Sequence, residues 1–415
     1  MKRVALVLLV IALPVLARVR AVRPVPDTAA GWLRQRAIRF ADLRPLVRET
    51  ANAKVVAIGD ATHGSHESYE ARQRLTPPLV AAGFRTIALE APYAEMARVN
   101  DYLLHGTGDP IAALRLDRYW FWDTNEVVDL IKWARAQNAA GLTPPIRIAG
   151  IDPTEPSSAA GVVIAFLRRV DPSAATNAAK SYRCLDNHYH GSSLCRSLVE
   201  SVRPAIEENR ARYAAVTSEA EVDELLHAAR VVEQGERVLA TNLAARDEMI
   251  AENVAWLVSR GERVLAFGHN EHWGRTPYVL VDPEPVRSAG MYLADVLGSG
   301  YYVIGTLLLD GTFLAVEYDP STLVGHIKTQ IMTPPSTDDY AVLFAQAGLD
   351  SMIVPMHAPL PPWLAGTHRQ RIAGSAVLSR DEATLDRAAD FGAKYDAVMY
   401  FRISTPTQLW HWPTI

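Results

Sequence analysis

The chain has 415 residues, of which 49% are hydrophobic and 21% are charged, a composition typical of a globular protein with a large core. Its formal net charge of -4 does not indicate a basic surface of the kind that binds nucleic acid. The sequence also lacks low-complexity tracts and repeats, which excludes solenoid architectures.

The N-terminus has the pattern of a secretory signal. Lys2 and Arg3 precede an apolar run over residues 4–17, and this run is shorter than the roughly 20 residues that span a membrane. We predict a signal peptide at residues 1–21 and export to the periplasm or the extracellular space. Two arginines directly after the run leave an uncleaved anchor open, and a buried N-terminal strand or helix is the alternative.

Apolar runs of strand length then alternate with helical patterns. The runs lie at 54–59, 85–90, 146–151, 263–268 and 301–309. The helical patterns lie at 66–82, 94–104, 123–138, 157–169, 240–259 and 288–298. Nearly continuous apolar strands separated by helices predict an α/β fold with a largely parallel central sheet flanked by helices.

The second half of the chain adds two features to this plan. Residues from about 172 to 260 lack strand signals and are predicted to form a helical insertion. Further apolar runs at 313–318, 352–357 and 396–401 could add strands to one edge of the sheet. We interpret residues 22–415 as one domain that carries the insertion.

The two cysteines, Cys184 and Cys195, lie within the predicted insertion. In an oxidising compartment such a pair can close a loop and stabilise the fold by roughly 2–3 kcal/mol. Two unpaired thiols are the alternative. The predicted export favours the disulfide and argues against a cysteine nucleophile.

Four of the apolar runs are followed by an ionisable residue, namely Asp60, Glu90, Asp152 and His269. Ligands of open α/β sheets bind at the carboxyl ends of the strands. One strand-end residue would carry no information, because polar residues begin every loop. Four at equivalent positions predict that these side chains converge on one site.

The segment GDATHGSHESYEARQRL is the densest in chemistry. Asp60 and His63 lie in its strand-to-helix turn, where a carboxylate can fix the imidazole tautomer and leave the other nitrogen as a base. The alternative is a loop histidine beside a helix N-terminus. On the following helix Arg72 could supply cationic stabilisation, whereas Arg74 is interpreted as the partner of Glu70 in a surface ion pair.

The segment FGHNEHWGR carries two more histidines directly after a strand. His269 and His272 could donate to an oxyanion, orient the substrate or act as a second acid or base; satisfied loop histidines are the alternative. His63 with His66 and His269 with His272 place possible metal ligands at short spacings in the sequence. Neither spacing matches a known zinc-binding pattern. We therefore favour a site without metal.

The segment RYWFWDTNEVV begins with aromatic residues. Tyr119, Trp120 and Phe121 either pack in the core or wall a cleft for a bulky, apolar substrate, and the sequence leaves both open. The chain contains no G-x-S-x-G elbow and no phosphate-binding glycine motif after a strand. These absences argue against a serine nucleophile and a nucleotide cofactor.

Taken in order, six segments resemble the erythromycin esterase family. They are GDATHGSHESYEARQRL, TIALEAPY, WFWDTNEVVDLIKWARAQN, IRIAGIDP, GHNEHWG and SAGMYLADVLGSGYYVIGTLLLDG, and the similarity extends from about 50 to 310 and more loosely to about 405. The resemblance implies an α/β core with helical elaborations around a deep cleft. Characterised members hydrolyse a macrolide lactone without a serine nucleophile.

The resemblance also implies roles for single residues. It places the family's catalytic histidine on His63 as the general base for water, and the preceding acidic residue on Asp60, where the family usually has Glu. The other counterparts are Arg72, Glu90 and His269, with His272 following. The motifs do not carry the macrolide specificity itself.

We therefore expect a hydrolase without metal or cofactor that cleaves a small-molecule ester or lactone, with macrolide resistance as one outcome. In this hypothesis Arg72 and His269 stabilise the oxyanion, and Glu90 tunes the charges. His272 and the three aromatic residues bind substrate. We expect no nucleic-acid partner and no membrane contact beyond an N-terminal anchor. The alternative is a metal- or haem-binding module of the wider superfamily, with His63, His269 and His272 as ligands.

Overall fold

A computed structural model of the chain describes residues 28–115, 117–185, 191–241, 243–279, 284–319, 322, 324–357, 359–377 and 384–411. The predicted signal peptide at residues 1–21 lies outside this part. Within it, no helix combines the length and the apolar character that crossing a membrane requires.

The described strands are β1 (Val55–Asp60), β2 (Thr86–Pro92), β3 (Arg147–Asp152), β4 (Val264–His269), β5 (Tyr301–Tyr318), β6 (Gly325–Ile331), β7 (Ser351–Pro355), β8 (Thr367–Ile372), β9 (Ala376–Val377), β10 (Leu385–Asp390) and β11 (Ala397–Ser404). The first helices are α1 (Ala29–Arg36), α2 (Arg44–Glu49), α3 (His66–Ala81), α4 (Tyr93–His105), α5 (Pro110–Leu114), η1 (Asp117–Trp122) and α6 (Asn125–Ala139).

Between β3 and β4 lie α7 (Pro156–Val170), α8 (Pro172–Tyr182), η2 (Arg183–Leu185), α9 (Ser193–Glu200), α10 (Val202–Glu207), α11 (Arg210–Ala214), α12 (Glu219–Ala240) and α13 (Arg246–Ser259). The remaining helices are α14 (Asn270–Trp273), α15 (Ala289–Leu297), η3 (Gly298–Gly300), α16 (Tyr340–Ala345) and α17 (Phe391–Lys394).

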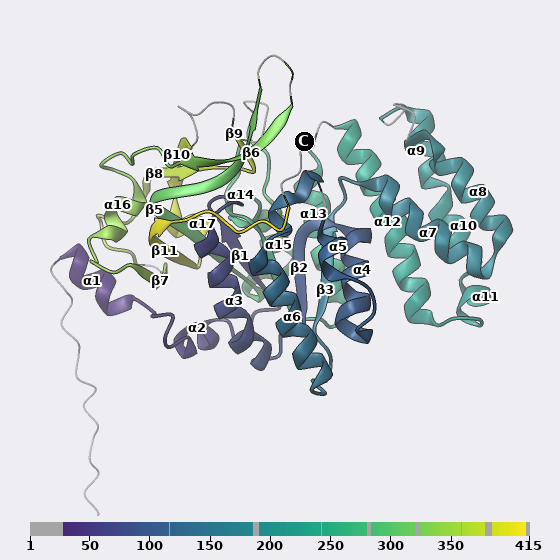
Figure 1. Cartoon of the computed structure of the whole chain (residues 1–415), viewed down its shortest axis with the longest axis horizontal. Coiled ribbons are helices and arrows are strands. Elements are labelled where there is room, and N and C mark those ends of the chain that lie inside the picture. The colour runs from purple at the N-terminus through teal and green to yellow at the C-terminus, as the bar shows by residue number, and fades with distance from the viewer. Residues whose placement is uncertain are drawn as a thin grey trace, which may run out of the picture.

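The central sheet has the order β3-β2-β4-β1-β5-β11-β7. Its neighbours are parallel except for β7, which pairs antiparallel with β11 at the edge. The predicted α/β fold with a largely parallel sheet flanked by helices is confirmed (Figure 1). The runs predicted at 352–357 and 396–401 form β7 and β11 and extend one edge, as expected.

Alternate residues of the strands enter different hydrophobic cores, which explains their continuous apolar character. On β1, Val56 and Ile58 pack with residues of α3 and α6, such as Leu75. Val55 and Ala57 instead belong to the core that contains residues of α13 and α15. Both faces of the sheet are thus covered, and functional groups gather where the strands end.

The helices from α7 to α12 build an arm with a core of its own beside the sheet (Figure 1). Cys184 and Cys195 are joined in this arm by a disulfide with a Cα–Cα distance of 5.5 Å, so the predicted bond is confirmed. The bond joins η2, which follows α8 directly, to α9.

Two sequence-based element predictions were wrong. Residues 240–259 do not form one helix, because the chain breaks after Ala240 and begins α13 at Arg246, with Leu243 at a φ of 70°. The run at 313–318 is the second half of β5 and not a separate strand. β5 continues because Gly311, at a φ of 116°, lets the strand pass the backbone of Ser404 where a Cβ would lie 2.1 Å from its oxygen.

Candidate active site

The carboxyl ends of β1, β2 and β4 bring the predicted site residues together. Asp60 and His269 are paired in register on neighbouring strands, and the His269 backbone N–H donates to Glu90 Oε2 at 2.9 Å. The rings of His63 and His269 are 5.4 Å apart between centroids. The four strand-end side chains therefore face one site, with Asp152 of β3 joined to it through an arginine described below.

His63 is held by a carboxylate at one ring nitrogen. Its Nδ1 lies 3.2 Å from Asp60 Oδ1, so the shorter aspartate still reaches the imidazole directly. The other nitrogen, Nε2, faces Glu90 Oε1 at 3.9 Å. Asp60 thus favours the tautomer with hydrogen on Nδ1, which leaves the Nε2 lone pair directed towards Glu90.

Arg72 lies behind Asp60, buried in the protein. Its Nη2 donates to Asp60 Oδ2 at 2.6 Å and to the carbonyl oxygens of Ile58 and Gly268. Burial raises the pKa of Asp60, but the charges of His63 and Arg72 outweigh it and hold this pKa at about 2. A guanidinium that is 2% exposed and bonded to Asp60 is placed to orient that carboxylate.

Glu90 is the centre of the charge network. Its Oε1 accepts from Arg246 Nη2 at 2.7 Å and lies 3.3 Å from His272 Nε2. Burial raises its pKa, but the charges of His272 and Arg246, followed by that of His63, hold the pKa well below the ordinary value. Glycine at 268 makes this position available, because a Cβ there would lie 2.6 Å from Glu90 Oε2.

Arg246 was missed by the sequence interpretation. It is the first residue of α13, and its guanidinium joins Glu90 to Asp152, with Nε 3.1 Å from Asp152 Oδ2. Its side chain is 14% exposed, more than those of Arg72, His63 or Glu90. No strand-end position or motif marked it, since it follows a helix break within an otherwise continuous helical pattern.

His272 has a carboxylate on each side. Its Nδ1 is 2.8 Å from Asp247 Oδ1, which also accepts from the hydroxyl of Tyr278 at 3.0 Å. Burial lowers the pKa of His272, but the charges of Asp247 and Glu90 outweigh burial and the opposing Arg246, and raise the pKa to about 10. The two carboxylates therefore favour the charged, imidazolium form of His272 over the opposing effect of Arg246, whose Nη1 lies 3.1 Å from His272 Nε2.

His269 has both ring nitrogens occupied. Its Nδ1 accepts from the backbone N–H of Glu271 at 3.3 Å, and its Nε2 lies 3.2 Å from the carbonyl oxygen of Ala373. Burial lowers the pKa of His269, although Asp60 opposes this shift. A neutral His269 with hydrogen on Nε2 satisfies both bonds, so the ring caps α14 as well as bordering the site.

The three aromatic residues before α6 are buried in this structure and belong to the main core. Phe121 stacks on His63, with ring centroids 4.0 Å apart and an interplanar angle of 9°. The Tyr119 hydroxyl bonds to that of Thr154 after β3, and Trp120 packs inside. The aromatic segment thus closes over His63, which is 5% exposed, and does not line an open cleft.

A C-terminal strap, residues 405–411, fastens the two loops that meet at His63. Thr407 N donates to the carbonyl oxygen of Gly64 at 3.0 Å, beside His63, and His66 N donates to that of Thr405 at 2.8 Å. Further along, Trp410 N donates to the carbonyl oxygen of Asp123, two residues after Phe121. The strap thereby fixes both rings of the His63–Phe121 stack.

The three candidate metal ligands do not direct their ring nitrogens at one point. Nε2 of His63 and Nε2 of His272 both face Glu90 Oε1, whereas both ring nitrogens of His269 contact backbone groups. Across the described ranges, no group of three or more His, Cys, Asp or Glu side chains is arranged to hold a metal ion. The side chains present do not fit a metal centre built on these histidines.

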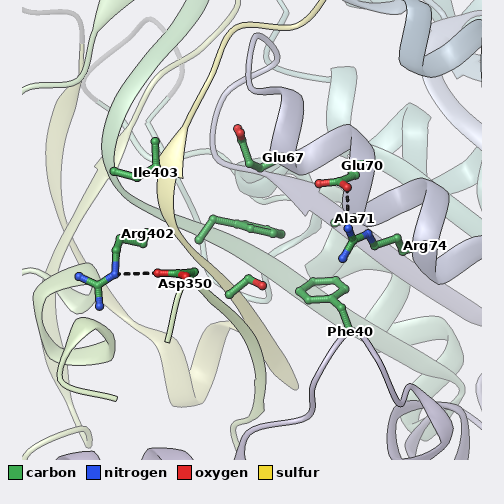
Figure 2. Close-up of a pocket in the computed structure, with 10 residues that line it drawn as sticks. Phe40, Glu67, Glu70, Ala71, Arg74, Asp350, Arg402 and Ile403 are labelled. Atoms are coloured by element: carbon green, nitrogen blue, oxygen red, sulfur yellow. Dashed lines mark hydrogen bonds and ion pairs between the residues drawn. The ribbon is translucent and has the colours of Figure 1, made fainter. Parts of the chain in front are cut away.

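A cavity of ≈ 350 Å³ lies beside α3 and β11, apart from these residues (Figure 2). Both arginines of its lining are already paired, Arg74 with Glu70 at 2.7 Å and Arg402 with Asp350 at 3.4 Å (Figure 2). The Arg74–Glu70 pair is the surface ion pair that the sequence predicted. None of the residues lining the cavity belongs to the charge network, so the cavity is not the candidate active site.

Known proteins of this fold share most of its length. A Bacillus cereus protein of 22% identity has a TM-score of 0.78 over 92% of this chain and 98% of its own. A succinoglycan biosynthesis protein of 18% identity has a TM-score of 0.77 over 92% and 97%. A mutant of the erythromycin esterase EreC in its open conformation, 15% identical, has a TM-score of 0.66 over 90% and 96%.

The family model described as erythromycin esterase matches residues 80–404. The match covers Glu90, Arg246 and both histidines after β4, and it begins after Asp60 and His63. It spans most of the chain and agrees with the fold. The chain belongs to the erythromycin esterase family.

Proposed function

We propose that this protein hydrolyses carboxylic esters, lactones in particular, with His63 as the general base for water. The observation that carries the proposal is the setting of the imidazole. Asp60 occupies Nδ1 at 3.2 Å, and Nε2 faces Glu90 across 3.9 Å. This arrangement supplies a basic nitrogen of defined tautomer beside a second acceptor.

The 3.9 Å separation admits a water about 2.8 Å from both His63 Nε2 and Glu90 Oε1. Such a water donates one hydrogen to each acceptor and directs its lone pair at a carbonyl carbon. As the oxygen attacks, its proton passes to His63, and Asp60 stabilises the imidazolium that forms. General-base help of this kind typically contributes about 10²–10⁴-fold in rate.

Arg246 is proposed as the group that stabilises the oxyanion, in place of Arg72. Its Nη2 and Nε serve Glu90 and Asp152, and among the described residues its Nη1 contacts His272 and no carboxylate. The greater exposure of its side chain supports contact with substrate. Electrostatic donors of this kind are worth about 10²–10³-fold in rate.

Substrate entry is proposed to need displacement of Phe121, because its ring covers the face of His63. A bulky apolar substrate would replace this stacking with contacts of its own. Macrolide lactones are candidates, because one structural relative is an erythromycin esterase. The disulfide is compatible with export, and we propose that residues 1–21 are the signal for it.

A hydrolysis screen tests the proposal. Purified protein is assayed on macrolides, smaller lactones, alkyl esters and aryl esters, each with and without excess chelator. We expect hydrolysis of at least one ester class that chelator leaves unchanged. Activity that disappears with chelator and returns with zinc would overturn the general-base mechanism, and absence of activity on every class would overturn the proposed function.

A further inference from the structure

Two Asp–His pairs face the same carboxylate oxygen from different elements. Asp60 holds Nδ1 of His63 from the end of β1, and Asp247 holds Nδ1 of His272 from α13. In both pairs Nε2 faces Glu90 Oε1, at 3.9 Å for His63 and 3.3 Å for His272, and His272 Nε2 also lies 3.1 Å from Arg246 Nη1. The proposed base thus has a counterpart of the same construction on the other side of Glu90.

The surroundings of the two imidazoles differ in charge. His63 shares Asp60 with the Arg72 guanidinium, so part of the negative charge beside it is already neutralised. Asp247 has no arginine among its described contacts and accepts instead from neutral donors, the Tyr278 hydroxyl and the backbone N–H of Ala289. The Arg246 guanidinium, 3.1 Å from His272 Nε2, opposes a positive charge on this imidazole. The two carboxylates, Asp247 at 2.8 Å and Glu90 at 3.3 Å, outweigh it and raise the pKa of His272 to about 10.

We infer that His272 is the general acid of the reaction and donates its Nε2 proton to the departing alkoxy oxygen. This inference rests on the proposed ester hydrolysis and adds a second catalytic histidine to it. Among the roles that the sequence left open for His272, it selects the acid in place of substrate binding.

The step balances in atoms and charge. Water adds to the carbonyl carbon and gives one proton to His63, and the carbon–oxygen bond to the alcohol then breaks. The bonding pair goes to the alkoxy oxygen, which takes the proton from His272 and leaves as an alcohol. His63 ends with one proton more and His272 with one fewer, and exchange through Glu90 or solvent restores both.

The leaving group distinguishes an acid from a positioning residue. An alkoxide is a poor leaving group and needs a proton, whereas para-nitrophenolate leaves without one. We expect His272→Gln to slow hydrolysis of ethyl butyrate by about 10²-fold or more and that of para-nitrophenyl butyrate by less than about 10-fold. Asp247→Asn should show the same selectivity with smaller losses. His66→Gln is the matched control and should slow both esters equally, if at all, because His66 pairs with Glu126 and not with Glu90.

Equal losses on both esters in His272→Gln would overturn the acid role and leave the proposed function standing. No ester hydrolysis by the wild-type protein would overturn both. Should the variant not fold, the wild-type protein decides the question with a series of aryl and alkyl butyrates. A shallow dependence of kcat/KM on the pKa of the leaving alcohol is expected, and a steep dependence would contradict proton donation.

Discussion

Asp60 illustrates how single residues in this protein depend on charge compensation. Its carboxylate is fully buried, and Arg72 contacts it at 2.6 Å while the guanidinium lies over the rings of Tyr69, Trp122 and Phe267. Removing one partner of a buried ion pair leaves a charge without compensation, which costs far more than losing an exposed pair. The same helix offers an exposed pair, Arg74 with Glu70, for comparison.

We therefore expect Arg72→Met to lower the free energy of unfolding by about 3–5 kcal/mol, because Asp60 would keep its charge without its cation. Arg74→Met, the matched control on α3, should change it by less than about 1 kcal/mol. Urea denaturation at neutral pH measures both values. Equal effects of the two substitutions would refute the account of Arg72 as the buried support of Asp60.

A site residue could be predicted from the sequence where the end of its strand or helix is visible in the hydrophobic pattern. Strand ends are visible as apolar runs followed by a polar residue, so Asp60, Glu90 and His269 could be found. Arg246 could not, because the helical pattern continues across 240–259 and hides the break at Leu243. That break is set by packing between distant elements, and the hydrophobic period does not record it.

Contacts made by the loops could not be predicted from the sequence either. The aromatic run at 119–121 fits a core or a cleft wall equally well in sequence, and its stacking on His63, beside the strap that bonds to Gly64 and Asp123, is seen only in the structure. Arg72 has the helical position that was expected, but its depth in the protein follows from the aromatic rings around it. Contacts between segments far apart in sequence leave no mark within either segment.

At the scale of elements, the disulfide gives a further prediction. Cys184 and Cys195 are 11 residues apart, and closing a loop of this length restricts the unfolded chain. Cys184→Ser with Cys195→Ser should destabilise the protein by about 2–3 kcal/mol. Hydrogen exchange should quicken in α8 and α9 more than in β1 and β4, because the helical arm has a separate core. Uniform acceleration across the sheet would count against this view.

At the scale of the whole molecule, the buried charges of the candidate site gather at the carboxyl ends of the strands, where the aromatic segment closes over them. The parallel direction of the inner strands was predicted from the alternation of apolar runs and helices, whereas their order comes from the structure alone. The network of buried charges gives the folded protein a dependence on pH that the unfolded chain lacks.

His272 determines the alkaline part of this dependence. Its pKa is about 10 in the folded protein and about 6.5 in an unfolded chain. Its contribution to stability is therefore complete below about pH 6.5 and is lost as the pH rises towards 10. Thermal melting between pH 6 and 10 should show the wild-type protein losing more stability than His272→Gln. Parallel curves for the two proteins would mean that His272 is not charged in the fold.

The central claim, that His63 is the general base, is tested most directly by kcat of His63→Asn on an ester that the wild-type protein hydrolyses. Asparagine keeps a polar group near Asp60 but has no basic nitrogen. The account predicts a loss of about 10²–10⁴-fold in kcat, with an unchanged circular dichroism spectrum. A folded His63→Asn protein with wild-type kcat would contradict it.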